Sequence, residues 1–389
     1  MLQTARVALP RGRPVSSLLA LPVRQQPRGC SAQSSSASAA GPTLADFMPK
    51  SSEAPDTRPA VMRKPKWLKM TNPNLTPEGA ERYKNVRATV KNSGLATVCQ
   101  EARCPNIGEC WSGGTATVMI MGDTCTRGCR FCSVATSRTP PPPDADEPQK
   151  VAAAVESWGL DYIVLTMVDR DDLPDQGASH ICRTVQELKS KAGLRVETLV
   201  GDFQGRMELV DQVVLSGMDV FAHNIETVDR LQSTVRDRRA GYQQTLSVLR
   251  RAKETRPDVV TKSSVMLGLG EEAEEVHQTL RDLRDAGVEI VTFGQYLQPT
   301  KRHMKVTRYV DPKEFDSWTA AGEALGLHVV SGPMVRSSYR AGDFFKQRLA
   351  LREAKASEKP RELDLGADIR TAASAAPFVD TARTHATAS

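Results

Sequence analysis

The sequence predicts an α/β fold built on a parallel sheet, and two observations support this prediction. From Thr115 onward, short runs of β-branched and apolar residues alternate with amphipathic stretches. Strands that alternate with helices of about 8 to 15 residues are typical of repeated βαβ units. Six such units would form an open, partial (β/α)6 barrel, and a doubly wound sheet is the alternative that the spacing leaves open.

Each expected element is a segment with the matching hydrophobic period. Strands are expected at residues 115–121, 162–168, 195–200, 220–224, 259–267 and 290–296. Helices are expected at residues 151–158, 179–191, 207–215, 242–254 and 271–285. In a parallel barrel, the loops after the C-terminal ends of the strands carry the active site. We therefore expect the functional residues at these strand ends.

The rest of the chain divides by composition. Residues 1–45 contain five arginines and seven serines but no lysine or acidic residue, which is typical of an organellar transit peptide, with a merely disordered tail as the alternative. Residues 46–114 form a polar, turn-rich N-terminal extension, 115–300 the barrel, and 301–352 a C-terminal extension. Residues 353–389 are rich in Ala, Ser and Thr without periodicity and are expected to be disordered.

The net charge gives no support for a nucleic-acid surface. The whole chain carries 52 basic and 46 acidic residues, but five of the basic residues lie in the first 45, which leaves 47 against 46. The basic balance therefore belongs to the N-terminal segment, and we expect no nucleic-acid partner. No apolar run reaches about 18 residues, so no membrane span is expected.

Six of the eight cysteines lie between positions 99 and 132. Cys125, Cys129 and Cys132 have the spacing C-x3-C-x2-C, and three thiolates can hold three corners of an iron–sulfur cube while the fourth iron stays open. An open metal position supports chemistry as well as electron storage. Structural zinc is the alternative, although zinc sites usually have two paired ligand sets. An odd number of cysteines cannot pair internally as disulfides.

The upstream triplet, Cys99, Cys104 and Cys110, is a weaker signal taken alone. It could hold structural zinc or add ligands to the downstream site. A second cluster is the better interpretation, because each triplet has three ligands for a site that requires four. Cys182 lies in a predicted helix and is expected to be a small buried apolar residue.

The downstream triplet, with Phe131 before its last cysteine and a βα-repeat chain around it, resembles the radical S-adenosylmethionine (SAM) superfamily. Together with the upstream triplet and the motif Arg336–Tyr339, it resembles the lipoyl synthase family over roughly residues 66–348. The resemblance implies a partial barrel of the radical SAM type, whose extensions carry an auxiliary iron–sulfur cluster. Further matching segments are residues 97–106, 168–173, 223–227 and 331–333.

The resemblance implies two [4Fe-4S] clusters with different roles. Cys125, Cys129 and Cys132 would bind the catalytic cluster, whose open iron chelates SAM. Electron transfer to SAM would give methionine and a 5′-deoxyadenosyl radical, which removes hydrogen from an unactivated carbon.

The upstream triplet would bind the auxiliary cluster, which is consumed as the sulfur source. By carry-over from the family, its fourth ligand is Ser338. The hydroxyl oxygen of Ser338 matches iron–sulfur chemistry less well than a thiolate, which suits an iron that must be released. On composition alone, Ser338 would be an ordinary surface serine.

The implied substrate is an octanoyl chain on a lysine of a lipoyl-carrier domain, and sulfur enters at its sixth and eighth carbons. Such domains belong to the E2 subunits of 2-oxoacid dehydrogenases and to the H protein of the glycine cleavage system. Other implied partners are an electron donor such as ferredoxin and the iron–sulfur assembly proteins. We expect a monomer in mitochondria, with plastids as the alternative. A non-catalytic iron–sulfur carrier and another two-cluster radical SAM enzyme are the competing functions.

Polar residues at or near the ends of the expected strands are candidate SAM contacts. They could hold the ribose, amino or carboxylate groups of SAM, or they could simply be satisfied polar residues at the barrel mouth. The candidates are Thr166, Asp169, Asn224, Glu226, Lys262 and Gln295.

Overall fold

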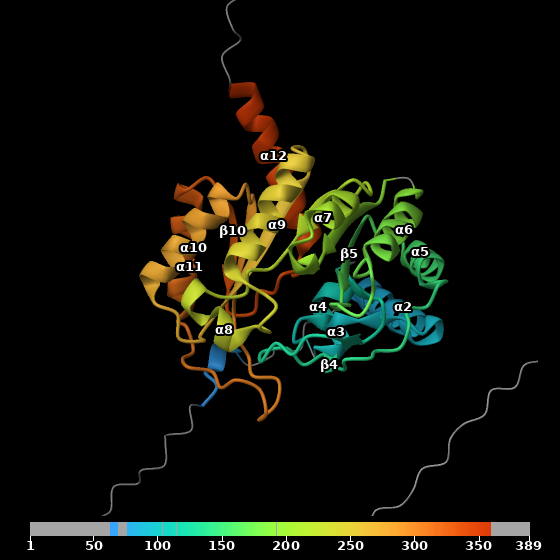
Figure 1. Cartoon of the computed structure of the whole chain (residues 1–389), viewed down its shortest axis with the longest axis horizontal. Helices are drawn as coiled ribbons and strands as arrows, with labels where there is room; N and C mark the ends of the chain where they lie inside the picture. The colour runs from blue at the N-terminus through green and yellow to red at the C-terminus, as the bar shows by residue number, and fades with distance from the viewer. Residues whose placement is uncertain (1–62, 69–75, 103, 114, 192, 359–389) are drawn as a thin grey trace, which may run out of the picture. The chain divides into compact units, whose positions relative to one another are not determined.

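An eight-stranded sheet forms the centre of the protein (Figure 1). The computed structural model describes residues 63–68, 76–102, 104–113, 115–191 and 193–358. The predicted transit segment, residues 1–45, lies outside this range, as does residue 359 onward of the predicted disordered tail. Along the sheet the strands are β1 (Ala96–Thr97), β2 (Thr117–Ile120), β5 (Tyr162–Met167), β6 (Arg195–Leu199), β7 (Val220–Ala222), β8 (Val260–Leu267), β9 (Ile290–Gln295) and β10 (His328–Gly332).

The strands from β2 to β10 run parallel and lie in chain order, and β1 joins the edge antiparallel. The ends of this order, β1 and β10, do not pair with each other, so the sheet is open. A doubly wound sheet would reverse its strand order at a switch point, and this sheet does not. The prediction of an open, partial barrel is therefore confirmed, and the six expected strands correspond to β2 and β5–β9.

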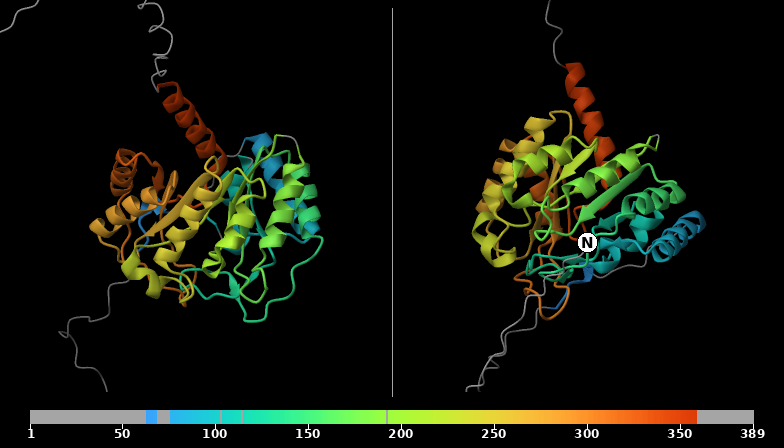
Figure 2. Two further views of the ribbon diagram at one scale, coloured as in Figure 1. Left: turned by 45° about the horizontal axis from the view of Figure 1, so that its top comes forward. Right: turned by 45° about the vertical axis from the view of Figure 1, so that its right-hand side comes forward.

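Helices cover the outer face of the curved sheet (Figures 1 and 2). Side chains alternate across each strand: Ile163 and Leu165 of β5 join the main hydrophobic core under these helices. The expected helices are observed within a few residues of their predicted bounds. They are α5 (Glu147–Trp158), α6 (Ala178–Lys189), α7 (Met207–Val214), α9 (Tyr242–Thr255) and α10 (Ala273–Asp285), to which the structure adds α11 (Pro312–Ala324).

The inner face of the sheet contains a second apolar cluster, at the N-terminal ends of the strands. Tyr162, Val164, Val220, Val260 and Ile290 form it together with two residues of α12 (Ala341–Glu358), Ala341 and Phe345. Burying one such large side chain contributes about 1.5–3 kcal/mol. Helix α12 thus closes the N-terminal end of the barrel interior, and the loops at the opposite end are left to form the site.

The N-terminal extension is more regular than its polar composition predicts. It contains the 17-residue helix α2 (Pro77–Ser93), then α3 (Val98–Glu101) and α4 (Ile107–Ser112). The Thr76 hydroxyl accepts a hydrogen bond from the Gly79 N–H (3.1 Å), and Gly94 ends α2 with φ of 64°. A threonine N-cap before proline and a left-handed glycine after the last turn are strong helix boundaries.

Two elements near the C-terminus also differ from the expectation. Strand β10 pairs in parallel with β9, so the sheet continues into the predicted C-terminal extension. Helix α12 runs to Glu358, so residues 353–358 of the expected disordered tail are helical. The remaining short helices are η1 (Lys66–Leu68), η2 (Phe203–Gly205), η3 (Asp229–Leu231) and α8 (Gln232–Val235). Among the described residues, no helix combines the length and apolarity needed to span a membrane.

Candidate metal centres

The downstream cysteines lie on a loop (residues 125–132, the cysteine loop) that follows β2 and is flanked by the two-stranded pair β3 (Thr124–Cys125) and β4 (Ala135–Thr136). Backbone amides point at two of the sulfurs. The Arg127 N–H donates to Cys125 Sγ and the Asp237 N–H donates to Cys129 Sγ, each at 3.3 Å. Such donors stabilise a thiolate over a thiol, which suits a metal ligand.

Three segments from distant parts of the chain hold the cysteine loop in place. One follows β5, one is the end of α8 and one follows β9, so the loop is fixed at the C-terminal end of the sheet. Its backbone contacts are Thr126 N–H to Asp169 O (2.9 Å), Arg130 N–H to Val235 O (2.9 Å) and Cys132 O to His303 Nε2 (2.9 Å).

A buried arginine anchors the same loop from within. The Arg127 side chain, 2% exposed, donates to Asp171 (2.8 and 3.0 Å) and to Asp202 (2.7 Å at both oxygens), and it lies 3.8 Å from Asp169. Burial by itself would raise the pKa of Asp171, but the Arg127 guanidinium holds it at about 2. Burial raises the pKa of Asp169 to about 6, against the opposing effect of Arg127. The buried Arg127 stabilises the fold only while all of its carboxylate partners are present, because a buried charge without a partner lowers stability.

The upstream cysteines line a separate pocket with about 280 Å³ of empty space. Ser338 lines it together with all three of these cysteines, and Arg336 and Tyr339 complete that side. Two hydrogen bonds join these remote segments: Asn106 Nδ2 to Met334 O (2.6 Å), and the Tyr339 hydroxyl to Glu109 (2.8 Å). The structure therefore brings Ser338 to the triplet from more than 220 residues along the chain.

Burial raises the pKa of all six thiols. It reaches about 11 for Cys125, Cys129 and Cys132 and about 12 for Cys110. At Cys99 burial again dominates, and Thr117 opposes it. Thiols in such surroundings are protonated at neutral pH without a metal, so a bound metal must displace their protons.

Within the described residues, no three His, Cys, Asp or Glu side chains converge on one point as ligands of a single ion would. A cubane cluster needs a different arrangement of ligands, because each thiolate binds a separate iron atom. Three cysteines and Ser338 that line one pocket fit that arrangement.

Comparison with known proteins assigns the family. The family model described as the Radical SAM superfamily matches residues 119–283. The protein named "Lipoyl synthase, mitochondrial" from Phytophthora infestans (strain T30-4) is 56% identical over 319 residues, which cover 79% of this chain and 82% of that protein. Proteins of the same name from Picea sitchensis and Drosophila sechellia are each 55% identical, and the matches cover 78% and 77% of this chain and 81% of each relative.

The chain belongs to the lipoyl synthase family. The resemblance that the cysteine spacing and residues 336–339 indicated is thereby confirmed. Membership of the radical SAM superfamily implies one [4Fe-4S] cluster and SAM.

Four of the predicted SAM contacts of this lipoyl synthase family member lie near the cysteine loop. Thr166 is the last residue but one of β5 and lies on its inner, buried face, and Asp169 follows the strand. Asn224 and Glu226 follow β7, and the Asn224 amide donates to the Glu226 carboxylate (3.1 Å). Burial raises the pKa of Cys132, and the nearby charges of Glu226 and Asp169 raise it further.

The other two predicted contacts already have partners within the chain. Lys262, third in β8, donates to the buried Glu197 carboxylate (2.8 Å), which also accepts from the Tyr162 hydroxyl (2.6 Å). The Gln295 amide donates to three backbone carbonyls and accepts from the Val310 N–H (2.8 Å). Among the described residues, neither side chain bonds to the cysteine loop.

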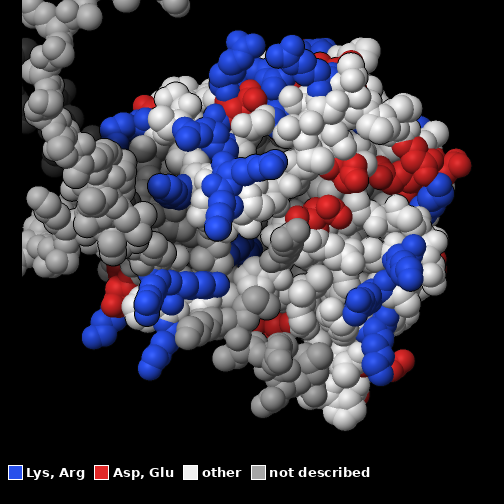
Figure 3. Space-filling view, turned by 90° about the horizontal axis from the view of Figure 1, so that it is seen from below, with Lys and Arg blue, Asp and Glu red and all other residues white. Residues whose placement is uncertain are grey.

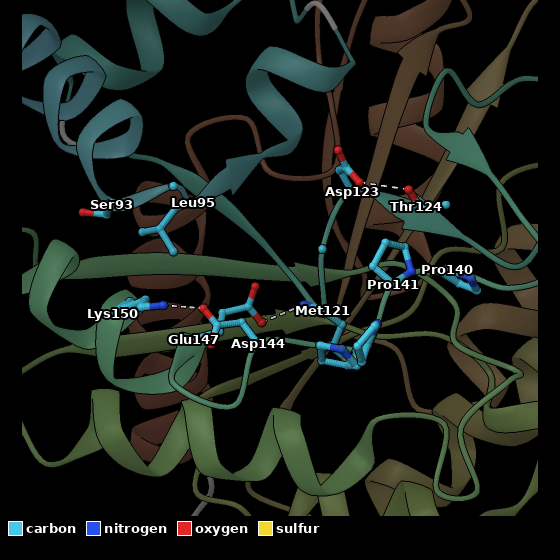
Figure 4. Close-up of a pocket in the computed structure, with 14 residues that line it drawn as sticks. Ser93, Leu95, Met121, Asp123, Thr124, Pro140, Pro141, Asp144, Glu147 and Lys150 are labelled. Carbon is cyan, nitrogen blue, oxygen red and sulfur yellow. Dashed lines mark hydrogen bonds and ion pairs between the residues drawn. The ribbon is translucent and has the colours of Figure 1, made fainter.

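A larger pocket, with about 620 Å³ of empty space, lies beside the segment that leads into the cysteine loop (Figure 4). Its polar groups bond mainly to the chain itself: the Glu147 carboxylate accepts from the Met121 N–H (2.7 Å) and lies 2.6 Å from His180 Nε2, and Lys150 pairs with Asp144. Met121 has φ of 67°, a conformation that costs a non-glycine residue free energy. Glu147 therefore helps to fix the turn from which the cysteine loop starts.

Proposed function

We propose that this chain is a mitochondrial lipoyl synthase, which inserts two sulfur atoms at the sixth and eighth carbons of an octanoyl chain on a lipoyl-carrier domain. The observation that carries the proposal is the different number of ligands at the two centres. The upstream pocket has three cysteines and Ser338, whereas the cysteine loop offers three thiols and no fourth ligand of its own. A site with four ligands suits a stored auxiliary cluster, and a site with three leaves one iron for SAM.

The two centres are adjacent, as sulfur transfer requires. The Ser133 hydroxyl, next to Cys132, donates to the Glu101 carbonyl (3.1 Å), which lies between Cys99 and Cys104. When bound, the catalytic cluster supplies the electron that cleaves SAM. Among the chain's own groups, Thr166, Asp169, Asn224 and Glu226 would bind and orient SAM. The apolar cluster under α12 would keep water from the far end of the barrel interior.

The proposed partners follow from the reaction. The substrate is an octanoylated carrier domain of a 2-oxoacid dehydrogenase or of the glycine cleavage system, and a ferredoxin-type protein supplies electrons. Iron–sulfur assembly proteins would rebuild the auxiliary cluster. Mitochondrial location is supported by the names of the relatives and by the Arg- and Ser-rich first 45 residues.

The function can be tested by anaerobic mass spectrometry. The reconstituted protein, reductant and SAM are incubated with an octanoyl-lysine carrier peptide. We expect a product with two added sulfurs, together with 5′-deoxyadenosine. If protein shown to contain both clusters forms neither product, the chain is instead a non-catalytic iron–sulfur carrier.

Replacing the proposed fourth ligand should uncouple the two halves of the reaction. We expect Ser338→Ala to form 5′-deoxyadenosine within about twofold of wild type but to lose at least tenfold in sulfur insertion. The matched control is Ser337→Ala, because this neighbouring hydroxyl does not line the pocket. The Mössbauer spectrum of the auxiliary cluster should change in the first variant only. Equal sulfur insertion by both variants would exclude Ser338 as a ligand.

A further inference from the structure

Among the described residues, five exposed cations lie in or beside the cysteine loop without a carboxylate partner. They form the basic rim, which consists of Arg130, Arg238, Lys301, Arg302 and Lys305. In the part of the chain that the structure describes, none of the five makes an ion pair. Some half-buried arginines on the outer helices are paired, since Arg251 pairs with Asp211 and Arg281 with Glu274.

The basic rim is one continuous surface, because its three segments are bonded to one another. The Met304 N–H donates to the Arg130 carbonyl (3.3 Å), and the Arg130 N–H donates to the Val235 carbonyl (2.9 Å). Arg239, beside Arg238, donates to the Thr126 carbonyl (2.8 Å).

Acidic residues are scarce in these segments. The sequence has none between Asp123 and Asp144, and none between Glu289 and Asp311. The carboxylate nearest the rim in sequence, Asp237, is bonded by Arg239 (2.8 Å) and by the Gly128 N–H (2.9 Å). The positive charge of the rim is therefore not neutralised within the described chain.

The face seen in Figure 3 carries many Lys and Arg side chains, and acidic side chains gather mainly toward its right-hand side. The short helix η1, blue in Figures 1 and 2, lies at the same end of the molecule. Its Trp67 is 45% exposed. Its neighbour in sequence, Lys66, is also exposed. Burial lowers the pKa of nearby Lys64, and the positive charge of Arg336 lowers it further. Exposed aromatic and arginine side chains are typical of protein interfaces.

We propose that the basic rim and Trp67 form the docking surface for the carrier domain, and that this domain is acidic around its octanoylated lysine. The inference rests on the proposed function, which requires that lysine to reach the cysteine loop, in or beside which the rim lies. Unpaired charges within about 8 Å of a partner act across solvent at physiological ionic strength. Complementary charge of this kind raises the association rate and fixes orientation.

The test compares two substrates of the same enzyme. In the cluster-loaded full chain, Arg238→Glu, Arg302→Glu and Lys305→Glu are combined. kcat/KM is measured with an octanoylated carrier domain and with a short uncharged octanoyl-lysine peptide, using dithionite as the reductant. The ratio of the two kcat/KM values, carrier over peptide, is expected to fall at least tenfold. The loss should be greatest at low salt, because added salt screens the charges of the wild-type pair.

The control reverses two exposed cations that lie on helices α6 and α9 and also lack an ion pair in the described residues. Arg183→Glu and Arg250→Glu together should leave the ratio within twofold. Binding of the octanoylated carrier domain, measured by calorimetry, should weaken at least tenfold for the rim variant only. Binding does not need turnover, so it tests the proposal even if the variant is inactive.

The possible outcomes distinguish failure of the docking proposal from failure of the proposed function. If wild type converts both substrates and the rim variant keeps the same ratio and affinity, the basic rim is not the docking surface. If only the ferredoxin-driven rate falls, the surface belongs to the electron donor and the proposal is wrong. If wild-type protein loaded with both clusters converts neither substrate, the proposed function fails, and calorimetry still decides whether the rim binds the carrier.

Discussion

Cys129→Ala is expected to abolish formation of 5′-deoxyadenosine, whereas Cys104→Ala is expected to keep it within a few fold of wild type and to abolish sulfur insertion. The physical reason is that the two thiols belong to different centres. Cys129 belongs to the cysteine loop, and its sulfur accepts a hydrogen bond from the Asp237 N–H. Cys104 lines the separate pocket that Ser338 also lines. Loss of one ligand should therefore empty one centre and leave the other loaded.

The measurement combines iron counting with quantification of 5′-deoxyadenosine and of the thiolated product. Each variant should retain about four of eight irons, which corresponds to one cubane of the proposed two. Cys182→Ala is the matched control, since Cys182 lies in the hydrophobic core and its thiol donates only to the Gln212 carbonyl (3.4 Å). Retained sulfur insertion in Cys104→Ala would overturn the assignment of the auxiliary cluster as the sulfur donor.

The sequence was sufficient to predict those structural features that depend on the spacing of nearby residues. The expected strands were right because hydrophobic period and turn residues act over a few positions. Helix α2 was missed because its face is mostly exposed, and only the caps at Thr76 and Gly94 mark it. The burial of Cys182 was predicted correctly.

Features that depend on the path of the chain could not be derived from local pattern. The approach of Ser338 to the upstream cysteines joins segments more than 220 residues apart, and only the family resemblance suggested it. The partner of Lys262 was equally hidden, because the local pattern around a lysine in a strand does not reveal a bond to Glu197, 65 residues away. The same limit applies to the buried partners of Arg127, which come from two different loops.

Arg127→Met is expected to lower the free energy of unfolding by about 3–5 kcal/mol at neutral pH, because it leaves the buried carboxylates without their cation. Asp202 is fully buried, and the Asp171 side chain is 8% exposed. Arg127→Lys should be intermediate, since one ammonium cannot bond both carboxylates as the guanidinium does. Arg239→Met is the matched control. Arg239 pairs with Asp171 from the same region but is 35% exposed, so its loss should cost about 1 kcal/mol or less.

The pH dependence of this loss distinguishes a broken charge network from a simple packing defect. In wild type, Arg127 holds the pKa of Asp171 at about 2, below the value of about 4 in an unfolded chain. The stabilisation is therefore complete above about pH 4 and disappears as the pH falls toward 2. The difference between wild type and Arg127→Met, measured by urea unfolding, should shrink over the same range. Adding Asp202→Asn should recover part of the loss at neutral pH, because it removes one unpaired charge. A loss that is independent of pH, and that Asp202→Asn does not relieve, would show that Arg127 acts through packing alone.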